Sequence, residues 1–274
     1  MDLMQLFNTT HPVVGVVHLQ PLPTSPRWGG NLRSVFDRAE QEATALASGG
    51  VDAIIVENFF DAPFTKHRVD PAVVSSMTLV VQRLMTMVSV PIGINVLRND
   101  AHSALAIATC VGAPFIRVNV LTGVMVTDQG VIEGQAHELM RYRRELGSDT
   151  KILADVLVKH ASPLGTPNNL VTAVEDTLVR GLADGIIISG RATSNPPSLE
   201  DLKTATVAAK GSPVLIGSGA SWDNIADLIQ WSDGAIVSSS LKRKGDITQP
   251  IDPIRVRQFV ESMEYGAAMK QAKT

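Results

Sequence analysis

Charged and amide side chains stand near the C-terminal ends of several short apolar runs in this sequence. An arginine in such a place can bind a carboxylate or a phosphate through two parallel hydrogen bonds. A carboxylate can act as a general base if burial raises its pKa, and a lysine can form a Schiff base if desolvation lowers its pKa. The residues of this kind are His18, Glu57, Asn95, Arg117, Asn119, Asp155, Lys159 and His160.

Side-chain chemistry divides these residues into two sets. The candidate catalytic residues are Glu57, Asp155, Lys159 and His160. The candidate ligand-binding residues are His18, Asn95, Arg117 and Asn119. The histidines, with His67, are also candidates for proton transfer, although a single histidine is more often a hydrogen-bonded structural residue. Carboxylate and imidazole groups at strand ends could also bind a metal, but no histidine-rich spacing supports such a site, so no metal site is assigned and the cofactor stays unknown.

A structural alternative stays open for the charged residues. Glu57 and Asp155 would then neutralise Arg117 and Lys159 in an internal salt-bridge network. Burying each ion costs several kcal/mol before pairing offsets it, and we therefore favour a functional site. The two interpretations can coexist.

The period-two alternation of strands predicts where these side chains point. In the run 115–119, Ile116 and Val118 suit the side of a sheet that helices cover. Arg117 and Asn119 then point to the other side, into the interior. The same parity places Ala53, Ile55, Glu57, Gly93, Asn95, Leu153, Asp155, Leu157 and Lys159 inside, and Val120, Ile152, Ala154, Val156 and Val158 outside.

Eight β-branched runs, each followed by an amphipathic stretch, predict a single (β/α)8 barrel. The runs are Val13–His18, Val51–Glu57, Pro91–Val96, Phe115–Asn119, Lys151–Val158, Gly185–Ser189, Pro213–Ser218 and Gly234–Ser238. The domain spans residues 1–274, with a frayed polar tail over about 267–274. Each candidate residue lies toward the C-terminal end of its own run, so we expect the candidates to gather at one mouth of the barrel.

Three connections that follow strands are longer than simple turns. They are Leu19–Asn31, Leu121–Gly134 and Lys159–Asn169. Within the second, Asp128-Gln129-Gly130 stands between apolar flanks and predicts a small hairpin. All three lie on the side where barrels of this kind bind ligands.

Glycine and serine late in the chain predict an anion site. Gly217, Ser218 and Gly219 follow the seventh run and precede a helix expected near Trp222, and Ser239 follows the eighth run. Exposed backbone N–H groups and a helix N-terminus bind phosphate after strands seven and eight in many barrels. Ser189, Gly190 and Arg191, after the sixth run, are further candidates. The alternative is that these residues only permit turns and cap the helix.

Composition excludes several classes of protein. The formal net charge is −3, so no basic surface indicates a nucleic-acid partner. The single cysteine, Cys110, excludes an internal disulfide, and its apolar neighbours predict a buried position on a helix. We find no signal peptide and no run of the ~20 apolar residues that a membrane span needs. Met263, Tyr265 and Met269, with Lys270 and Lys273, form a weak candidate for an interfacial patch, although packing on the barrel explains the apolar members more simply.

Seven short motifs together resemble the BtpA/SgcQ family from about Thr10 to Tyr265. They are Val-Val-His18-Leu-Gln-Pro21-Leu-Pro23, Val56-Glu57-Asn58 with Asp61-Ala-Pro63-Phe64, Ile116-Arg117-Val-Asn119, Asp128-Gln-Gly130, Asp155-Val-Leu-Val-Lys159-His160, Ser189-Gly190 and Gly217-Ser218-Gly219. The resemblance implies a barrel with a phosphate-site-like end. The match looks closest to the cyanobacterial members, which are associated with biogenesis or stability of photosystem I as extrinsic proteins at the thylakoid membrane.

The resemblance leaves three hypotheses for function. The first is a photosystem I biogenesis or stability factor that keeps a barrel ligand site, with reaction-centre proteins or their assembly machinery as partners. The second is an enzyme, such as a lyase, aldolase or nucleosidase, that acts on a small phosphorylated or glycosidic metabolite, since other members occur in organisms without photosynthesis. The third is a barrel that senses a metabolite without turnover. The expected location is cytoplasmic or peripheral on the cytoplasmic face of the thylakoid, and homo-oligomers are common for such folds.

Overall fold

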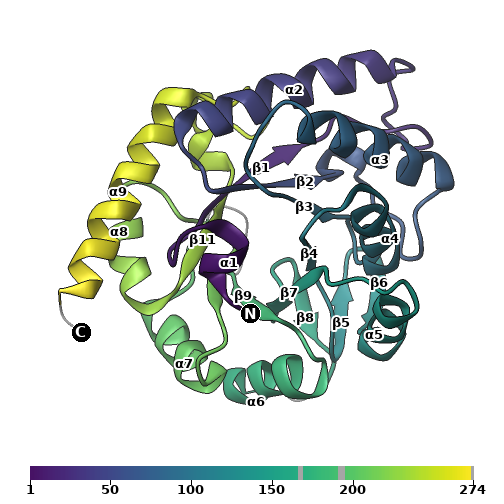
Figure 1. Cartoon of the computed structure of the whole chain (residues 1–274). Coiled ribbons are helices and arrows are strands. Elements are labelled where there is room, and N and C mark those ends of the chain that lie inside the picture. Colours follow the sequence, from purple (N-terminus) through teal and green to yellow (C-terminus); the bar gives the residue numbers. More distant parts are fainter. Residues whose placement is uncertain (166–168, 191–194, 273–274) are drawn as a thin grey trace.

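The computed structural model describes residues 1–165, 169–190 and 195–272, and confirms the predicted (β/α)8 barrel (Figure 1). The barrel strands are β1 (Val13–His18), β2 (Ala53–Glu57), β3 (Ile92–Asn95), β4 (Phe115–Val118), β7 (Lys151–Val156), β9 (Gly185–Ile188), β10 (Val214–Ile216) and β11 (Gly234–Val237). They close in the order β1-β11-β10-β9-β7-β4-β3-β2, and all neighbouring pairs are parallel. Each strand falls within one of the predicted runs.

Helices surround the closed sheet, as Figure 1 shows. They are α2 (Leu32–Gly49), α3 (Pro71–Met85), α4 (Ala101–Val111), α5 (Ala136–Glu145), α6 (Leu170–Glu175) with its π-helical extension Asp176–Arg180, α7 (Leu199–Ala209), α8 (Ile225–Leu228) and α9 (Pro253–Gln271). Their apolar stripes, such as Val35, Ala43 and Leu46 of α2, are buried against the outer face of the barrel. This burial removes the apolar face of each helix from water and holds the strands in register.

The interior of the barrel is filled as strand parity predicts. Ile55 and Leu153 belong to one buried cluster with Phe115, whereas Ile116 and Ile152 belong to the layer beneath the helices. In the fifth predicted run, the alternation of inward and outward side chains stops where β7 ends, because Leu157 has a φ of 51° and turns the chain. Val158, which parity places outside, therefore lines the mouth instead.

A short helix that the sequence analysis did not anticipate closes the N-terminal end of the barrel. This helix, α1 (Leu3–Phe7), lies across the barrel axis in Figure 1. Its Phe7 ring meets the ring of Phe115 edge-on at a centroid distance of 5.3 Å. The apolar interior is thereby sealed at one end and open only at the other.

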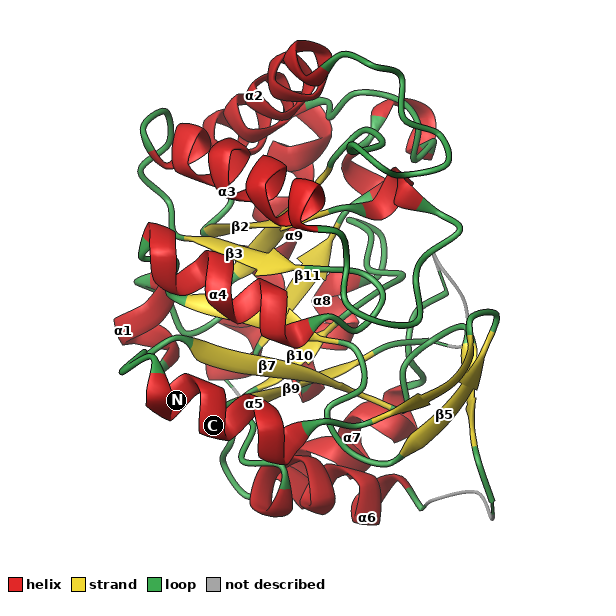
Figure 2. Cartoon of the chain, turned by 90° about the vertical axis from the view of Figure 1, so that its right-hand side faces the viewer, coloured by secondary structure: helices red, strands yellow, loops and turns green. Residues whose placement is uncertain are grey.

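A small antiparallel sheet stands at the opposite end from α1 (Figure 2). It consists of β5 (Val124–Thr127), β6 (Gly130–Glu133) and β8 (Ala161–Pro163), in the order β6-β5-β8. The predicted hairpin around Asp128 is confirmed, and the loop after β7 adds a third strand to it. Met125, Ile132 and Val158 form a buried cluster with Val120 under this sheet.

Two local expectations differ from the structure. Cys110 is exposed on α4, because Ala104 and Ala108 face the barrel and Cys110 lies about 200° around the helix from Ala108. The tail expected to fray over about 267–274 is helical through Gln271, the last residue of α9. Within the described ranges, the structure contains no helix long and apolar enough to cross a bilayer.

Gly93 tests the packing of the interior. A Cβ atom at this position would overlap the Phe115 ring. We expect Gly93→Ala to lower the free energy of unfolding by about 1–3 kcal/mol, because added volume in a packed core forces its neighbours aside. Urea denaturation measures the change. Gly29→Ala is the matched control, since its Cβ would meet no atom within 4 Å and stability should stay unchanged.

Candidate functional site

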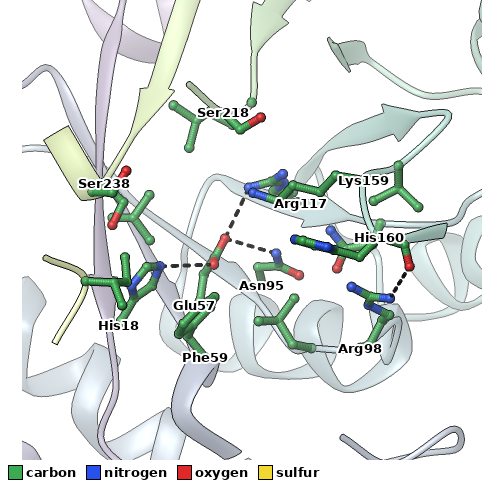
Figure 3. A pocket seen from close by; sticks show the side chains of 18 of the residues that line it. His18, Glu57, Phe59, Asn95, Arg98, Arg117, Lys159, His160, Ser218 and Ser238 are labelled. Carbon is green, nitrogen blue, oxygen red and sulfur yellow. Dashed lines mark hydrogen bonds and ion pairs between the residues drawn. The ribbon is translucent and has the colours of Figure 1, made fainter. Parts of the chain in front are cut away.

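A cavity of about 260 Å³ opens at the carboxyl ends of the barrel strands (Figure 3). Predicted residues that line it are His18, Glu57, Asn95, Arg117, Asn119, Lys159, His160, Gly217, Ser218, Gly219 and Ser239. Asp155 lies behind Arg117, and Ser189 and Gly190 do not line the cavity. His67 is exposed and lines a separate surface groove, and Arg191 lies outside the described residues.

Arg117 joins two carboxylates at the floor of the cavity. Its Nε and Nη2 donate to the two oxygens of Asp155 at 3.0 and 2.9 Å, and Nη1 donates to Glu57 Oε1 at 3.3 Å. Burial alone would lower the pKa of Arg117, but the charges of Asp155 and Glu57 raise it well above its usual range. The fork that could clamp a ligand is therefore already occupied by Asp155. This part of the site is the salt-bridge network that the structural alternative describes.

Glu57 is held as an anion by its neighbours. Its Oε1 also accepts from Asn95 Nδ2 at 3.0 Å, and its Oε2 lies 3.6 Å from His18 Nε2. Burial raises the pKa of Glu57, but the contacts with His18 and Arg117 outweigh burial and lower it to about 2. The raised pKa that a general base would need is therefore absent at Glu57.

His18 is a neutral imidazole in this setting. Burial lowers its pKa more than Glu57 raises it, and the Phe59 ring stacks on it at 4.2 Å. Because Nε2 faces the carboxylate of Glu57, that nitrogen carries the proton and Nδ1 carries the lone pair. Within the described part of the chain, Nδ1 is buried without a hydrogen-bond partner.

Asn119 has the same feature on the opposite side of Arg117. Its Nδ2 donates to Asp155 Oδ2 at 2.8 Å, which fixes the amide. Its Oδ1 is buried, and no residue of the described segments donates to it. The cavity wall thus carries two acceptors that the protein leaves unsatisfied.

Lys159 is half-buried and differs from the fully buried charges at the mouth. Over residues 1–165, 169–190 and 195–272, no carboxylate pairs with its ammonium and no acceptor receives a hydrogen bond from it. Burial lowers its pKa, and the positive charge of Arg117 lowers it further. Lys159 is thus outside the salt-bridge network in which the alternative interpretation included it, and it has the environment of a reactive amine.

The sequence analysis missed Arg98. This residue follows β3 and lines the cavity near Lys159, and its Nη1 lies 3.4 Å both from Asp128 Oδ1 and from the carbonyl oxygen of His160. The contacts connect the barrel rim to the small sheet and to the rim residue His160, whose pKa burial and the charge of Lys159 lower. Arg98 could have been predicted from its position, because it lies three residues beyond the end of β3, just as Lys159 lies three residues beyond the end of β7.

Asn58 and Asp61, in one of the recognised motifs, have a positioning role. Asn58 Oδ1 accepts from the Leu97 amide at 2.7 Å, and its Nδ2 donates to Asp61 at 2.9 Å. Asp61 in turn accepts from the Leu22 amide at 2.7 Å. These bonds tie the loops after β1, β2 and β3 together around the mouth.

The proposed anion end of the cavity consists of backbone. Gly217–Ala220 and Val237–Ser239 line it, and Gly219 has a φ of 73°. A Cβ atom at Gly219 would overlap the backbone of Asn195 and Pro196, so only glycine fits there. In the described chain, the amide groups of Gly219 and Ala220 have no protein acceptor.

The helix expected near Trp222 begins only at Ile225 and has four residues, so no helix terminus serves this end. Asn224 explains why the helix starts later than expected, because its side chain holds the preceding segment in a turn. It accepts from the Ser221 amide at 2.8 Å and donates to the Gly219 carbonyl at 3.0 Å. The Ser218 hydroxyl is likewise used internally, between the Gly190 amide and the Asn195 carbonyl. Because the Ser218 hydroxyl is already engaged, anion binding here would rest mainly on backbone amides.

Lys242 supports this end from behind. Its ammonium is fully buried, 2.7 Å from both carboxylate oxygens of Glu42, which Arg38 also contacts at 2.7 Å. This ion pair anchors the loop after β11 to α2. Lys242 therefore points away from the cavity. No group of three His, Cys, Asp or Glu residues able to hold a metal ion occurs in the described segments.

Fold and site together define a (β/α)8 barrel with a charged mouth. The chain belongs to the BtpA family, whose sequence profile matches residues 9–265. It is 72% identical to the Photosystem I biogenesis protein BtpA of Synechocystis sp., over 100% of this chain and 95% of that protein. An uncharacterized protein of Pyrococcus furiosus is 47% identical over 91% of this chain and 93% of its own length, and one of Caenorhabditis elegans is 31% identical over 94% and 95%.

Solved structures share the fold. The phosphoribosylanthranilate isomerase of Pyrococcus furiosus superposes with a TM-score of 0.55 at 14% identity, covering 93% of this chain and 99% of its own. The enzyme of that name from Thermus thermophilus gives 0.55 at 10% identity, over 92% and 98%. At these identities the likeness concerns the barrel alone.

The low pKa of Glu57 makes stability depend on pH. The stabilisation is present in full above the unfolded-state pKa near 4.5 and is lost as pH falls toward the folded value of about 2, a loss on the order of 3 kcal/mol. We expect Glu57→Gln to remove this part of the acid dependence, measured as the free energy of unfolding in urea between pH 6 and about 2. Glu145→Gln, in an exposed pair with Arg141, should leave the dependence unchanged.

Proposed function

We propose that this chain acts in the biogenesis or stability of photosystem I, and that its barrel mouth binds a small phosphorylated or otherwise anionic metabolite. The first part is supported by the full-length similarity to the Synechocystis protein. The second is supported by one observation above all, a half-buried lysine in the cavity, Lys159, with which no carboxylate of the described residues pairs.

Charge balance favours an anion in the cavity. Arg117 is neutralised twice over, by Asp155 and Glu57. Arg98 shares only the mostly exposed carboxylate of Asp128, 3.4 Å away, and Lys159 pairs with no carboxylate among the described residues. An anionic ligand in the cavity would offset the positive charge of these two cations and replace the water that burial removes from them.

The phosphate end is expected at Gly219 and Ala220. Both residues line the cavity, no described residue accepts from their amides, and many (β/α)8 barrels bind phosphate after the seventh and eighth strands. Uncharacterized relatives of Pyrococcus furiosus and Caenorhabditis elegans match nearly the whole length of this barrel.

Attachment to the cytoplasmic face of the thylakoid would follow from this role, through reaction-centre proteins or their assembly factors. The C-terminal patch gives little support for direct insertion. Met263 is buried against the barrel, and Lys270 donates to the Ser232 carbonyl and pairs with Asp233. Tyr265 and Met269 remain exposed, and Lys273 lies outside the described residues. Homo-oligomerisation stays a prediction.

Complementation tests the dependence of photosystem I on the cavity. In a Synechocystis strain that lacks the related protein, we expect this chain to restore photosystem I, measured as P700 per chlorophyll. Lys159→Ala should fail to restore it, because the ligand loses its cation, whereas Lys210→Ala on the exposed surface should restore it fully. Full rescue by Lys159→Ala would support a scaffold role without a ligand.

Thermal unfolding tests the anion site directly. We expect inorganic phosphate to raise the Tm of the purified protein above that in sodium chloride of equal ionic strength, since a ligand at a hundred times its Kd stabilises by about 2.7 kcal/mol. The shift should be much smaller in Lys159→Ala and unchanged in Lys210→Ala. An equal shift in all three proteins would contradict specific binding at the mouth.

Product analysis then separates catalysis from sensing. An enzyme, whether lyase, aldolase or nucleosidase, converts the bound metabolite, whereas a sensor releases it unchanged.

A further inference from the structure

Two hydrogen-bond acceptors of residues that line the cavity, His18 Nδ1 and Asn119 Oδ1, indicate which groups the ligand carries. His18 and Asn119 are each only 5% exposed, and His18 Nδ1 and Asn119 Oδ1 have no donor within the described residues. Leaving a buried polar atom unpaired is unfavourable, and native proteins rarely do so. Both residues line the cavity, so a ligand that presents hydroxyl groups there would remove this cost.

A third atom extends the pattern. Ser238 Oγ is also buried without a partner in the part of the chain that the structure describes, and it lies near His18 in Figure 3. Unpartnered polar atoms therefore occur at His18 and Ser238, on the β1 and β11 side, and at Asn119 after β4. Lys159 and Arg98 line the same cavity. Such a cavity complements a molecule with several hydroxyl groups as well as an anionic group.

Lys159 adds a reactive group to this binding surface. It projects into the same cavity as Arg117 and Arg98, and no carboxylate of the described residues lies within salt-bridge distance of its ammonium. An amine that is desolvated next to another cation is the arrangement in which lysines attack carbonyl carbons. A cavity of about 260 Å³ lies just below the range of about 300–1,000 Å³ for drug-sized ligands, which suits a small metabolite.

Building on the proposed anion site, we infer that the ligand is a sugar phosphate with a free carbonyl group and that Lys159 captures this carbonyl as an imine. The phosphate contacts the amides of Gly219 and Ala220, the hydroxyl groups donate to His18 and Asn119, and the carbonyl carbon meets Lys159.

The chemistry balances without a further reactant. The neutral amine, after its proton has passed to solvent, attacks the carbonyl carbon, and the π electrons move to oxygen, which takes up a proton. The resulting carbinolamine loses its hydroxyl group and the nitrogen proton as one water molecule. The products are the C=N bond and water, with no change of oxidation state.

Reductive trapping tests the inference. Purified protein is incubated with ribose 5-phosphate and sodium cyanoborohydride, and adducts are located by peptide mass mapping. We expect Lys159 to gain the mass of the sugar phosphate less one oxygen atom, several-fold faster than the exposed Lys210 does. Inorganic phosphate should slow labelling of Lys159 only, and ribose without phosphate should label Lys159 several-fold more slowly.

Lys159→Arg is the matched variant, because it keeps the positive charge but cannot form the imine. It should lose the adduct while retaining the rise in Tm with inorganic phosphate. If phosphate raises the Tm of the native protein but Lys159 is labelled no faster than Lys210, the imine is excluded and the anion site stands. If phosphate neither raises the Tm nor slows labelling, the anion site fails as well.

Discussion

The mouth of this barrel depends on one guanidinium held between two carboxylates. Arg117 of β4 bonds to Asp155 of β7 through two nitrogens and to Glu57 of β2 through the third. In a nearly dry interior, removing Arg117 would leave two buried carboxylates without their counter-ion, and breaking a buried pair in this way typically costs 3–5 kcal/mol. These bonds fix the three strands relative to one another at the end where the cavity opens. The positions of the neighbouring side chains depend on this arrangement.

The same ion cluster separates the charged residues by role. Arg117 is satisfied by protein carboxylates, so it neutralises and positions its neighbours. Lys159 approaches the cluster from a loop, meets the positive charge of Arg117, and finds its carboxylates already engaged. The cluster thus leaves one amine with a lowered pKa beside acceptors that lack donors. Structural network and functional site are two parts of one arrangement, and neither excludes the other.

The periphery of the mouth is held by bonds between loops. Asn58 and Asp61 connect the first three loops, Arg98 contacts the small sheet, and the Ser240 hydroxyl donates to the Ala220 carbonyl at 2.8 Å. α1 covers the other end of the barrel, where Phe7 packs on Phe115. This organisation explains why several recognised motifs contain residues that do not line the cavity: they position the loops that do.

The sequence by itself determined the barrel, the inward direction of Glu57, Arg117 and Asp155, and the hairpin around Asp128. These features follow from local periodicity, because alternation along a strand fixes direction wherever the backbone is regular. Tertiary structure alone decided that Arg117 forms its paired hydrogen bonds with Asp155 and that Lys242 forms an ion pair with Glu42. It also decided that no described carboxylate pairs with Lys159. Such outcomes depend on distances between residues far apart in the chain, 200 positions for Lys242 and Glu42, and on single turns such as that at Leu157. The periodicity of the sequence contains no information on these long-range distances or on single turns.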